Sequence, residues 1–375
     1  MVDTNVNILI TGANGFVGKN LVCELKNKGF NNLFLYDIDT EIENLEEYVK
    51  KANFVFHLAG VNRPKDVSEF YQGNSDLTKH ITDLLAKNNN KAPILISSSV
   101  QAKMDNDYGK SKLQAENSIF EHSKNNNSPV FVYRLTGLFG KWSRPNYNSV
   151  ISTFCHNIAN GLEIEVRDRE YTFPVNYIDD VINSFVGCLN GEVKPKEDNY
   201  CYVENEYSVS LGFLADTISS FPKTRENLEI CDLSDSLTKK LYSTYLSYLP
   251  KDKFSYPLKM NVDNRGSFTE FIRTENKGQV SINVSKPHIV KGNHWHHSKN
   301  EKFLVVKGNG VIRFRKIDED EIIEYFVSGD KLEVVDIPVG YTHNIENLGD
   351  EDMVTVMWVN EPFDKEKPDT YYVEV

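Results

Sequence analysis

The apolar positions follow two different patterns along the chain. Up to about residue 187, short β-branched or aromatic runs alternate with amphipathic stretches, which is typical of a parallel sheet with crossover helices. After residue 260 the chain has closely spaced short strands and few helical runs, which favours a barrel or jelly roll. The expected strands are NILIT, NLFLYD, FVFHLA, PILISSS and FVYRL in the first part and QVSINVS, KFLVVKGNGVIRFRKI, EIIEYFVSGDKLEVVDIP and MVTVMWV in the second.

The two patterns meet in the segment YLPKDKFSYPLKMN, where two prolines follow an expected helix over about residues 234–249. A chain of 375 residues exceeds the usual size of a single hydrophobic core, so two domains are expected. We predict an α/β domain over residues 1–247, a linker over 248–261 and an all-β domain over 262–375.

The composition is that of an ordinary globular protein, with 40% hydrophobic and 26% charged residues. The net charge of -12 is spread over both halves and disfavours binding to nucleic acid or to anionic lipid. The N-terminus shows no leader pattern and no run of about eighteen apolar residues occurs, so no membrane span is expected. The five scattered cysteines form no CxxC pair, which favours reduced thiols and a cytoplasmic location.

Three glycines in ITGANGFVG follow the first expected strand and open a helix. Gly12, Gly15 and Gly18 would let the backbone approach a pyrophosphate at the positive end of that helix. Tight turns also use glycine for conformational reasons alone, so the pattern is weak by itself. Asp37, however, ends the second expected strand 19 residues after Gly18, where a carboxylate can bind ribose hydroxyls. In this context we favour a dinucleotide site.

Tyr108 and Lys112 in the segment YGKSK lie four residues apart on an expected helix, and therefore on one face. An isolated pair of this kind is usually a packed tyrosine beside a solvated lysine, but here the serine run 97–99 ends a strand just upstream. A free tyrosine has a pKa near ~10, so proton transfer near neutral pH requires a shift of about 3 units, or roughly 4 kcal/mol. A neighbouring ammonium lowers the tyrosine pKa.

The glycine fingerprint, HLAG at 57–60, the serine run and YxxxK together resemble the extended short-chain dehydrogenase/reductase family over about residues 5–245. The resemblance implies a Rossmann-type sheet, NAD(P)H as cofactor and a nucleotide-linked sugar as substrate. It implies Tyr108 as acid/base, Lys112 as its electrostatic partner and Ser99 as the residue that orients the carbonyl. The expected cofactor-binding residues are Gly12, Asn14, Gly15, Phe16, Gly18, Asp37, Leu58, Ala59, Gly60 and Lys112.

Some details depart from the family pattern. Many relatives carry Pro-Asn where this chain has Thr136 and Gly137, and the connection from the serine run to YGKSK is shorter than usual. The segments RLTGLFGKW and YTFPVNYIDDV still resemble those that line the sugar nucleotide. The Asp37 carboxylate repels a 2′-phosphate and so favours NADH, whereas Arg63 could offset that repulsion. The choice between NADH and NADPH stays open.

The segment HWHHSKNE, residues 294–301, places three histidines within four positions and a carboxylate four residues later. If residues 291–297 form a strand, His294 and His296 point to one face and the intervening tryptophan to the other. Far downstream, PVGYTHNIEN supplies His343. Three imidazoles and a carboxylate suit Zn, Fe, Mn or Ni, whereas the alternative is a set of solvated strand histidines.

The spacing of this histidine segment and of PVGYTHNIEN resembles the two cupin motifs. The resemblance implies a cupin jelly roll that binds a divalent metal, expected to be zinc, and it leaves His297 outside the ligand set. DNRGSFTEFIR resembles the opening of the keto-sugar epimerases of the cupin superfamily, which place residues such as Arg265 and Glu270 near a nucleotide sugar. Those epimerases generally work without a metal, so the ligand set is a departure. The expected metal ligands are His294, His296, Glu301 and His343.

Over essentially the whole chain, this combination resembles the bifunctional capsular-polysaccharide enzymes that process UDP-linked 2-acetamido-2,6-dideoxy-4-keto-hexoses. The resemblance implies C3 epimerisation in the cupin domain, followed by NAD(P)H-dependent reduction at C4 in the first domain. The chemistry favours this order, because the C3 hydrogen is acidic only while C4 is a ketone. The base that removes the C3 proton stays open among His288, Lys291, His297 and Tyr341.

Two alternatives stay open. The chain could be a 4-keto reductase whose cupin domain only stabilises a dimer, or a non-catalytic sensor that binds NAD(H) and a UDP-sugar. The intact pair of Tyr108 and Lys112 disfavours the sensor. The expected partners are a UDP-linked 4-keto-6-deoxy-N-acetylhexosamine and, because cupin barrels often pair through strands, a second copy of the chain.

Overall fold

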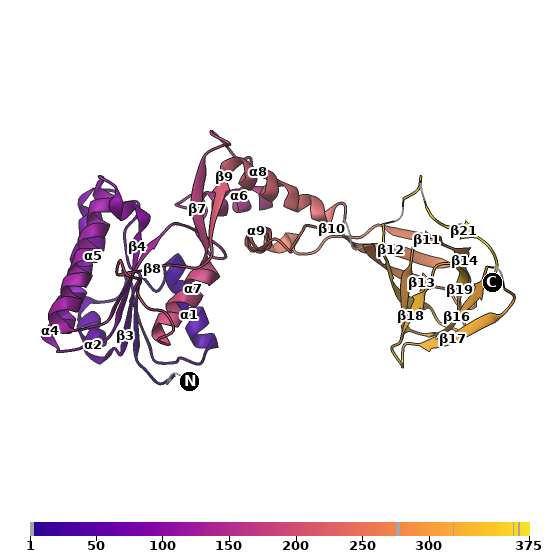
Figure 1. The fold of residues 1–375 in the computed structure, drawn as a ribbon, viewed down its shortest axis with the longest axis horizontal. Coiled ribbons are helices and arrows are strands. Elements are labelled where there is room, and N and C mark those ends of the chain that lie inside the picture. The colour runs from indigo at the N-terminus through magenta and orange to yellow at the C-terminus, as the bar shows by residue number, and fades with distance from the viewer. Residues whose placement is uncertain (1–3, 275–277, 318, 363, 367) are drawn as a thin grey trace. The chain divides into compact units, whose positions relative to one another are not determined.

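The computed structural model describes residues 4–274, 278–317, 319–362, 364–366 and 368–375 (Figure 1). The chain divides into two compact units that interleave in sequence. The first consists of Met1–Ser219 with Lys239–Leu249, and the second of Ser220–Thr238 with Pro250–Val375. Within the predicted linker over 248–261 lies the short helix η4 (Lys251–Lys253). The predicted domain limits at 247 and 262 stay a prediction.

The first unit is built on a parallel sheet whose six strands follow the order β2-β1-β3-β4-β5-β8. Its inner strands read as continuous apolar runs because helices cover both faces. The first five strands coincide with the five runs expected from the sequence. The bounds are β1 (Ile8–Thr11), β2 (Leu33–Tyr36), β3 (Phe54–His57), β4 (Ile94–Ser99), β5 (Val130–Leu135) and β8 (Tyr200–Cys201).

Helices pack on the two faces of this sheet, and Figure 1 shows them on opposite sides of the strands. Alternate side chains of β1 point to different faces: Ile8 and Ile10 belong to one buried apolar cluster and Leu9 to the other. The first cluster includes residues of α1 (Phe16–Asn27) and α7 (Ile178–Leu189). The second includes residues of α2 (Ile42–Lys51), α4 (Leu77–Lys87) and α5 (Asp107–Asn126).

A small three-stranded sheet completes the first unit, in the order β6-β7-β9. The expected helix over about 234–249 corresponds to α9, from which Lys240 forms an ion pair with Asp180 at 2.6 Å. The remaining elements of the first unit are α3 (Ser68–Phe70), the π-helix η1 (Tyr71–Asp76), η2 (Val100–Lys103), β6 (Gly137–Phe139), α6 (Val150–Ala159), β7 (Thr172–Tyr177), β9 (Glu206–Ser210), α8 (Leu211–Ser220) and most of α9 (Ser236–Leu246). The short helix η3 (Phe221–Arg225) belongs to the second unit.

The second unit contains two sheets of mainly antiparallel strands. The larger follows the order β10-β12-β13-β20-β15-β18, with β11 also paired to β12, and the smaller follows β17-β16-β19-β14-β21. The bounds are β10 (Glu229–Ile230), β11 (Met260–Asp263), β12 (Gly266–Thr274), β13 (Gly278–Ser285), β14 (Val290–Trp295), β15 (Glu301–Lys307), β16 (Asn309–Lys316), β17 (Ile322–Ser328), β18 (Val334–Ile337), β19 (Tyr341–Asn347), β20 (Met353–Val359) and β21 (Tyr371–Tyr372).

The core of the second unit lies between its two sheets. Phe303 and Val335 from the larger sheet share one buried cluster with Ile312, Phe314 and Ile345 from the smaller. The sheets therefore pack face to face, as a two-sheet β domain requires. Among the described residues, no helix combines the length and the apolar character needed to cross a membrane.

Candidate functional site

The glycine loop fills the turn between β1 and α1. Gly12 has φ +69°, and a Cβ there would lie 2.7 Å from the Ala59 backbone nitrogen. The Gly15 amide donates to the Gly12 carbonyl at 3.0 Å, and a Cβ on Gly18 would lie only 2.1 Å from that same oxygen. Nearby backbone atoms leave no room for a side chain at these glycines. The N-terminus of α1 therefore remains accessible to a phosphate group.

Asp37 lies at the end of β2, directly beside the glycine loop. Its Oδ2 accepts the backbone amide of Asn14 at 2.7 Å, and its Oδ1 accepts the amide of Ile38 at 2.8 Å. A carboxylate held in this position suits the ribose hydroxyls of a dinucleotide. Arg63, the residue that could offset its charge, donates to Asn148 at 2.8 Å. The glycine loop and Asp37 therefore fit a dinucleotide. They do not decide between NADH and NADPH.

His57 in the HLAG segment has a structural role that the sequence did not reveal. Its Nδ1 lies 2.7 Å from the Thr11 hydroxyl and its Nε2 lies 2.7 Å from the Thr78 hydroxyl. Burial, together with the charge of Lys112, lowers the His57 pKa to about 3, so the ring is neutral. The Thr11 hydroxyl also accepts the Ala59 amide at 3.2 Å. This network fixes HLAG against β1.

Lys112 is buried beneath the end of β4. Its Nζ donates to the Ser97 carbonyl at 3.0 Å, and burial lowers its pKa to about 8 while Glu116 opposes that shift. The same Nζ lies 3.0 Å from the place that a Cβ on Gly60 would occupy. Gly60 therefore makes room for the ammonium, which connects the HLAG segment to YGKSK.

Tyr108 lies one helical turn before Lys112 on α5 and is half-buried, with its ring centroid 5.6 Å from that of Phe70. Burial raises the Tyr108 pKa, and a hydrogen bond with Ser99 opposes the rise. The sequence led us to expect a lowered tyrosine pKa. That expectation does not hold for the protein chain alone, because desolvation outweighs the hydrogen bond.

Ser98 and Ser99, at the end of β4, have different environments. The Ser98 hydroxyl donates to the buried Glu116 at 2.5 Å and is thereby occupied. The Ser99 hydroxyl accepts the Gln101 amide at 3.2 Å and forms the hydrogen bond with Tyr108. Of these two serines, Ser99 is the one hydrogen-bonded to Tyr108, and its role as carbonyl orienter stays a prediction.

Glu116 forms a buried network that sequence reasoning missed. Its side chain is fully buried, and Arg134 binds it through two nitrogens, at 2.9 Å from Nε and 2.6 Å from Nη2. The Tyr200 hydroxyl adds a bond of 3.1 Å. Glu116 thus joins α5, β5 and β8. The four-residue spacing from Lys112 to Glu116 on one helix was the signal available in the sequence.

The late histidines and Glu301 come together in the second unit. One nitrogen from each imidazole and one carboxylate oxygen all lie within 4.8 Å of one another. Glu301 Oε2 is 3.2 Å from Nε2 of His343 and 3.7 Å from Nε2 of His296. His343 and His296 are only 1% and 3% exposed. The four residues of the cluster are His294, His296, Glu301 and His343.

The cluster has the chemistry of a cation site. Among the described residues, Nε2 of His296, Nε2 of His343 and Oε2 of Glu301 are buried without a hydrogen-bond partner. Burial pushes the Glu301 pKa upward, but contacts with His296 and His343 outweigh it and lower the pKa to about 2. Burial and the charge of His343 lower the His294 pKa to about 4. An ionised carboxylate and a neutral imidazole are the forms that bind a metal.

The strand that carries the first two histidines is shorter than predicted. β14 ends at Trp295 rather than at His297, and its pairing with β19 shifts between Gly292 and His294. The alternation of faces nevertheless persists. The His294 and His296 ring centroids are 5.0 Å apart, whereas the His297 ring lies 4.4 Å from that of Trp295, away from the cluster.

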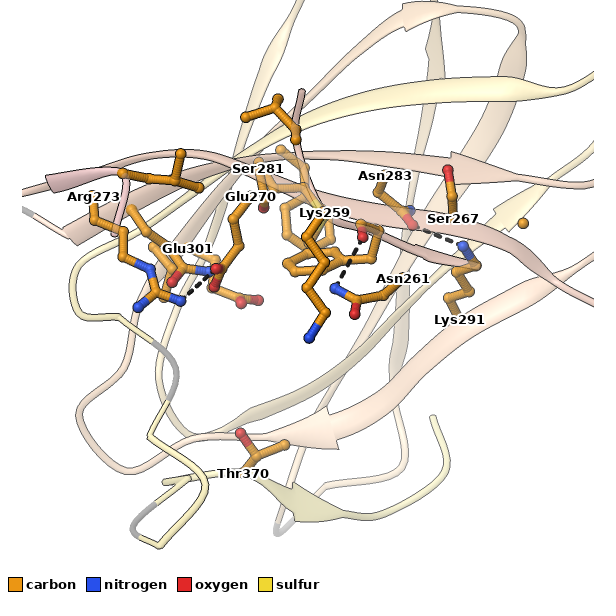
Figure 2. Close-up of a pocket in the computed structure, with 18 of the residues that line it drawn as sticks. Lys259, Asn261, Ser267, Glu270, Arg273, Ser281, Asn283, Lys291, Glu301 and Thr370 are labelled. Atoms are coloured by element: carbon orange, nitrogen blue, oxygen red, sulfur yellow. Dashed lines mark hydrogen bonds and ion pairs between the residues drawn. The ribbon is translucent and has the colours of Figure 1, made fainter. Parts of the chain in front are cut away.

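The cluster lies on the wall of a cavity of about 1470 Å³ within the second unit (Figure 2). Arg265 and Glu270 both line this cavity, and Figure 2 shows the ion pair between Glu270 and Arg273. Lys291 also lines it, with its Nζ 2.8 Å from Asn283 Oδ1, and burial lowers its pKa. Among the four candidate bases, Lys291 is therefore the one that lines the cavity.

A parallel α/β unit with a glycine loop and a Tyr/Lys pair, followed by a strand-rich unit, defines a nucleotide-dependent epimerase or reductase class. The chain belongs to the NAD dependent epimerase/dehydratase family, which matches residues 8–200. Residues 261–371 match the polysaccharide biosynthesis C-terminal domain. A nicotinamide cofactor follows from the family.

Individual relatives match nearly the whole chain. The UDP-2-acetamido-2,6-beta-L-arabino-hexul-4-ose reductase of Pseudomonas aeruginosa is 42% identical over 370 residues, which cover 99% of each chain. The crystal structure of the capsular polysaccharide assembling protein CapF from Staphylococcus aureus has a TM-score of 0.93 and 55% identity, and covers 98% of this chain and 100% of that one. A CapF structure with the inhibitor 3-isopropenyl-tropolone has a TM-score of 0.88 and 51% identity, with the same coverage. The predicted family resemblance, fold class and enzyme class are confirmed.

Proposed function

We propose that the chain is a bifunctional nucleotide-sugar enzyme of capsular or surface polysaccharide biosynthesis. Its second unit epimerises C3 of a UDP-linked 2-acetamido-2,6-dideoxy-4-hexulose, and its first unit then reduces C4 with NAD(P)H. The observation that carries the proposal is the coexistence of a Tyr108/Lys112 pair and a buried His/Glu cluster in one chain. The full-length similarity to a hexulose reductase and to CapF supports the same substrate class.

In the first unit, we assign proton transfer to Tyr108. A nicotinamide bound at the glycine loop would supply the hydride for C4, and the Tyr108 hydroxyl is placed to donate the proton to the C4 oxygen. Ser99, which is hydrogen-bonded to Tyr108, orients the carbonyl oxygen. Lys112 is 6% exposed and keeps its ammonium near the reacting groups, where a positive charge favours the phenolate left after transfer.

In the second unit, we assign His294, His296, Glu301 and His343 as the ligands of a divalent metal, with zinc as the expected ion. Such an ion supplies Lewis acidity to a carbonyl oxygen. The protein contributes an ionised carboxylate from Glu301 and the buried imidazoles of His296 and His343. Lys291 is the best-placed base for the C3 proton, since burial lowers its pKa and it faces the cavity.

We further propose that the chain forms a homodimer through its strand-rich unit. β17 lies at the edge of the smaller sheet and exposes Ile322, Tyr325 and Phe326, the last at 70%. An apolar edge strand of this kind is suited to pairing with a second copy. Light scattering of wild type and of Phe326→Glu measures the oligomeric state. A wild-type dimer that the substitution weakens supports the proposal, and a wild-type monomer contradicts the proposal.

Product analysis tests the proposed sequence of reactions. Purified chain is incubated with the UDP-4-keto sugar, with and without reduced cofactor, and the products are read by NMR. The proposal predicts a C3-epimerised ketone without cofactor and the reduced epimer with it. A product reduced at C4 with the original C3 configuration would support the alternative, a 4-keto reductase with a structural metal-stabilised domain.

A further inference from the structure

Asp369 ties the C-terminal segment to the loop that follows His296. Its Oδ1 accepts the His297 amide at 3.0 Å, and its Oδ2 accepts the amides of Ser298 and Lys299 at 2.9 and 3.0 Å. The Ser298 hydroxyl donates to the same Oδ2 at 3.0 Å. One carboxylate thus satisfies three successive backbone donors, and these bonds hold its pKa below the usual range although burial alone would raise it.

The backbone carbonyl of Asp369 acts on His296 itself. Nδ1 of His296 lies 2.5 Å from that oxygen. Because a carbonyl can only accept, Nδ1 carries a proton, and in the neutral ring this leaves the lone pair on Nε2. Nε2 is the atom that faces Glu301 inside the cluster, at 3.7 Å from Oε2. The tautomer that this carbonyl selects is therefore the one that can bind a cation there.

The backbone around Asp369 is held in place on both sides. Asp369 has φ +40°, a left-handed conformation that residues other than glycine adopt only where their surroundings enforce it. Just after it, β21 pairs with β14 at His294 and Trp295. Just before it, the Pro368 carbonyl accepts Lys299 Nζ at 2.6 Å. The segment is thus a fixed support rather than a loose end.

We infer that Asp369 is a positioning residue of the histidine cluster. Its carbonyl sets the tautomer of His296, and its carboxylate fixes the 297–299 loop. The inference rests on the proposed metal site, and it adds a residue far from the cluster in sequence to that site. A ligand held in its binding orientation loses less freedom when a metal binds, so this support raises metal affinity.

Zinc affinity of the full chain tests this inference. Metal-stripped wild type, Asp369→Asn and Glu366→Gln are titrated with Zn²⁺ in competition with a chromophoric chelator. Asparagine preserves size but has one acceptor oxygen in place of two, so Kd is expected to weaken by about 10- to 100-fold. Glu366 is an exposed acid of the same segment, and its substitution is expected to leave Kd unchanged. The visible spectrum of the Co²⁺-loaded chain should change only in Asp369→Asn.

Equal zinc affinity and equal Co²⁺ spectra in wild type and Asp369→Asn would overturn the inference while leaving the metal site intact. A wild type that binds no zinc would overturn the proposed metal site instead, and the inference with it. Should Asp369→Asn fail to fold, the inference is tested on the His296 tautomer in metal-free wild type. Long-range ¹⁵N–¹H correlation spectra show which ring nitrogen carries the proton. An Nδ1–H ring supports the inference, and an Nε2–H ring contradicts it.

Discussion

Glu301 Oε2 lies 3.2 Å from His343 Nε2, with the carboxylate 12% exposed and the imidazole 1% exposed. Burying a carboxylate and an imidazole together removes their hydration, which costs free energy. A hydrogen bond or a neighbouring opposite charge must offset that cost. The neighbouring His294 and His296 make the site suited to a divalent cation rather than to an isolated ion pair.

Removing the only carboxylate of the cluster should remove the metal. We predict that Glu301→Gln weakens zinc binding by about 100-fold or more, because the neutral amide cannot balance a divalent charge. Metal content by mass spectrometry and chelator competition measure the change. Glu361→Gln, which alters another acid on the cavity wall, is the matched control and should retain zinc. Full zinc retention in Glu301→Gln would contradict the ligand assignment.

The two proposed activities should separate by mutation. We predict that Tyr108→Phe lowers the rate of C4 reduction by about 10²- to 10⁴-fold, since the proton donor is lost. The epimerisation, assigned to the other unit, should proceed at the wild-type rate. Conversely, His296→Ala should abolish epimerisation while NAD(P)H binding persists. Loss of both activities in Tyr108→Phe would argue against two independent sites.

The reduction should depend on the protonation of Lys112. Burial lowers the Lys112 pKa to about 8, whereas it raises that of Tyr108, so Lys112 loses its proton first as pH rises. We predict that kcat/KM for reduction falls as pH increases through about 8, because a neutral amine no longer stabilises the phenolate. In Lys112→Arg the guanidinium stays protonated, so any residual activity should persist to higher pH. An identical high-pH limb in both proteins would contradict this assignment.

The Glu116 network should be a major contributor to stability. Glu116→Gln leaves the Arg134 guanidinium without its bidentate partner, and breaking a buried pair costs about 3–5 kcal/mol. Urea unfolding followed by Tyr and Trp fluorescence should show a lower midpoint for the first unit. Glu47→Gln breaks an exposed pair with Lys51 and should leave the midpoint unchanged. Equal midpoints for Glu116→Gln and Glu47→Gln would refute the claim.

Much of the fold could be predicted because its signals are local. The five β-branched or aromatic runs of the first unit form neighbouring strands in the observed sheet, and Gly12, Gly15 and Gly18 lie where there is no room for a side chain. The histidine cluster was also predictable, since His294 and His296 are close in sequence and an alternating strand brings them to one face.

What the sequence did not reveal depends on contacts between distant segments. Asp369 reaches its histidine from 73 residues away, and an isolated aspartate near a chain end carries no local signal. His57 is part of a motif, yet its role as a buried neutral hydrogen-bond partner of Thr11 and Thr78 depends on burial. The raised pKa of Tyr108 likewise reflects desolvation, which spacing alone does not show.

Solvent deuterium exchange tests the central claim most directly. The zinc-loaded chain is incubated in D₂O with the UDP-4-keto sugar and without reduced cofactor, and C3 is followed by ¹H NMR. We predict that the C3 proton signal disappears in wild type and in Tyr108→Phe but persists in Glu301→Gln. Persistence of that signal in the zinc-loaded wild type would contradict the account.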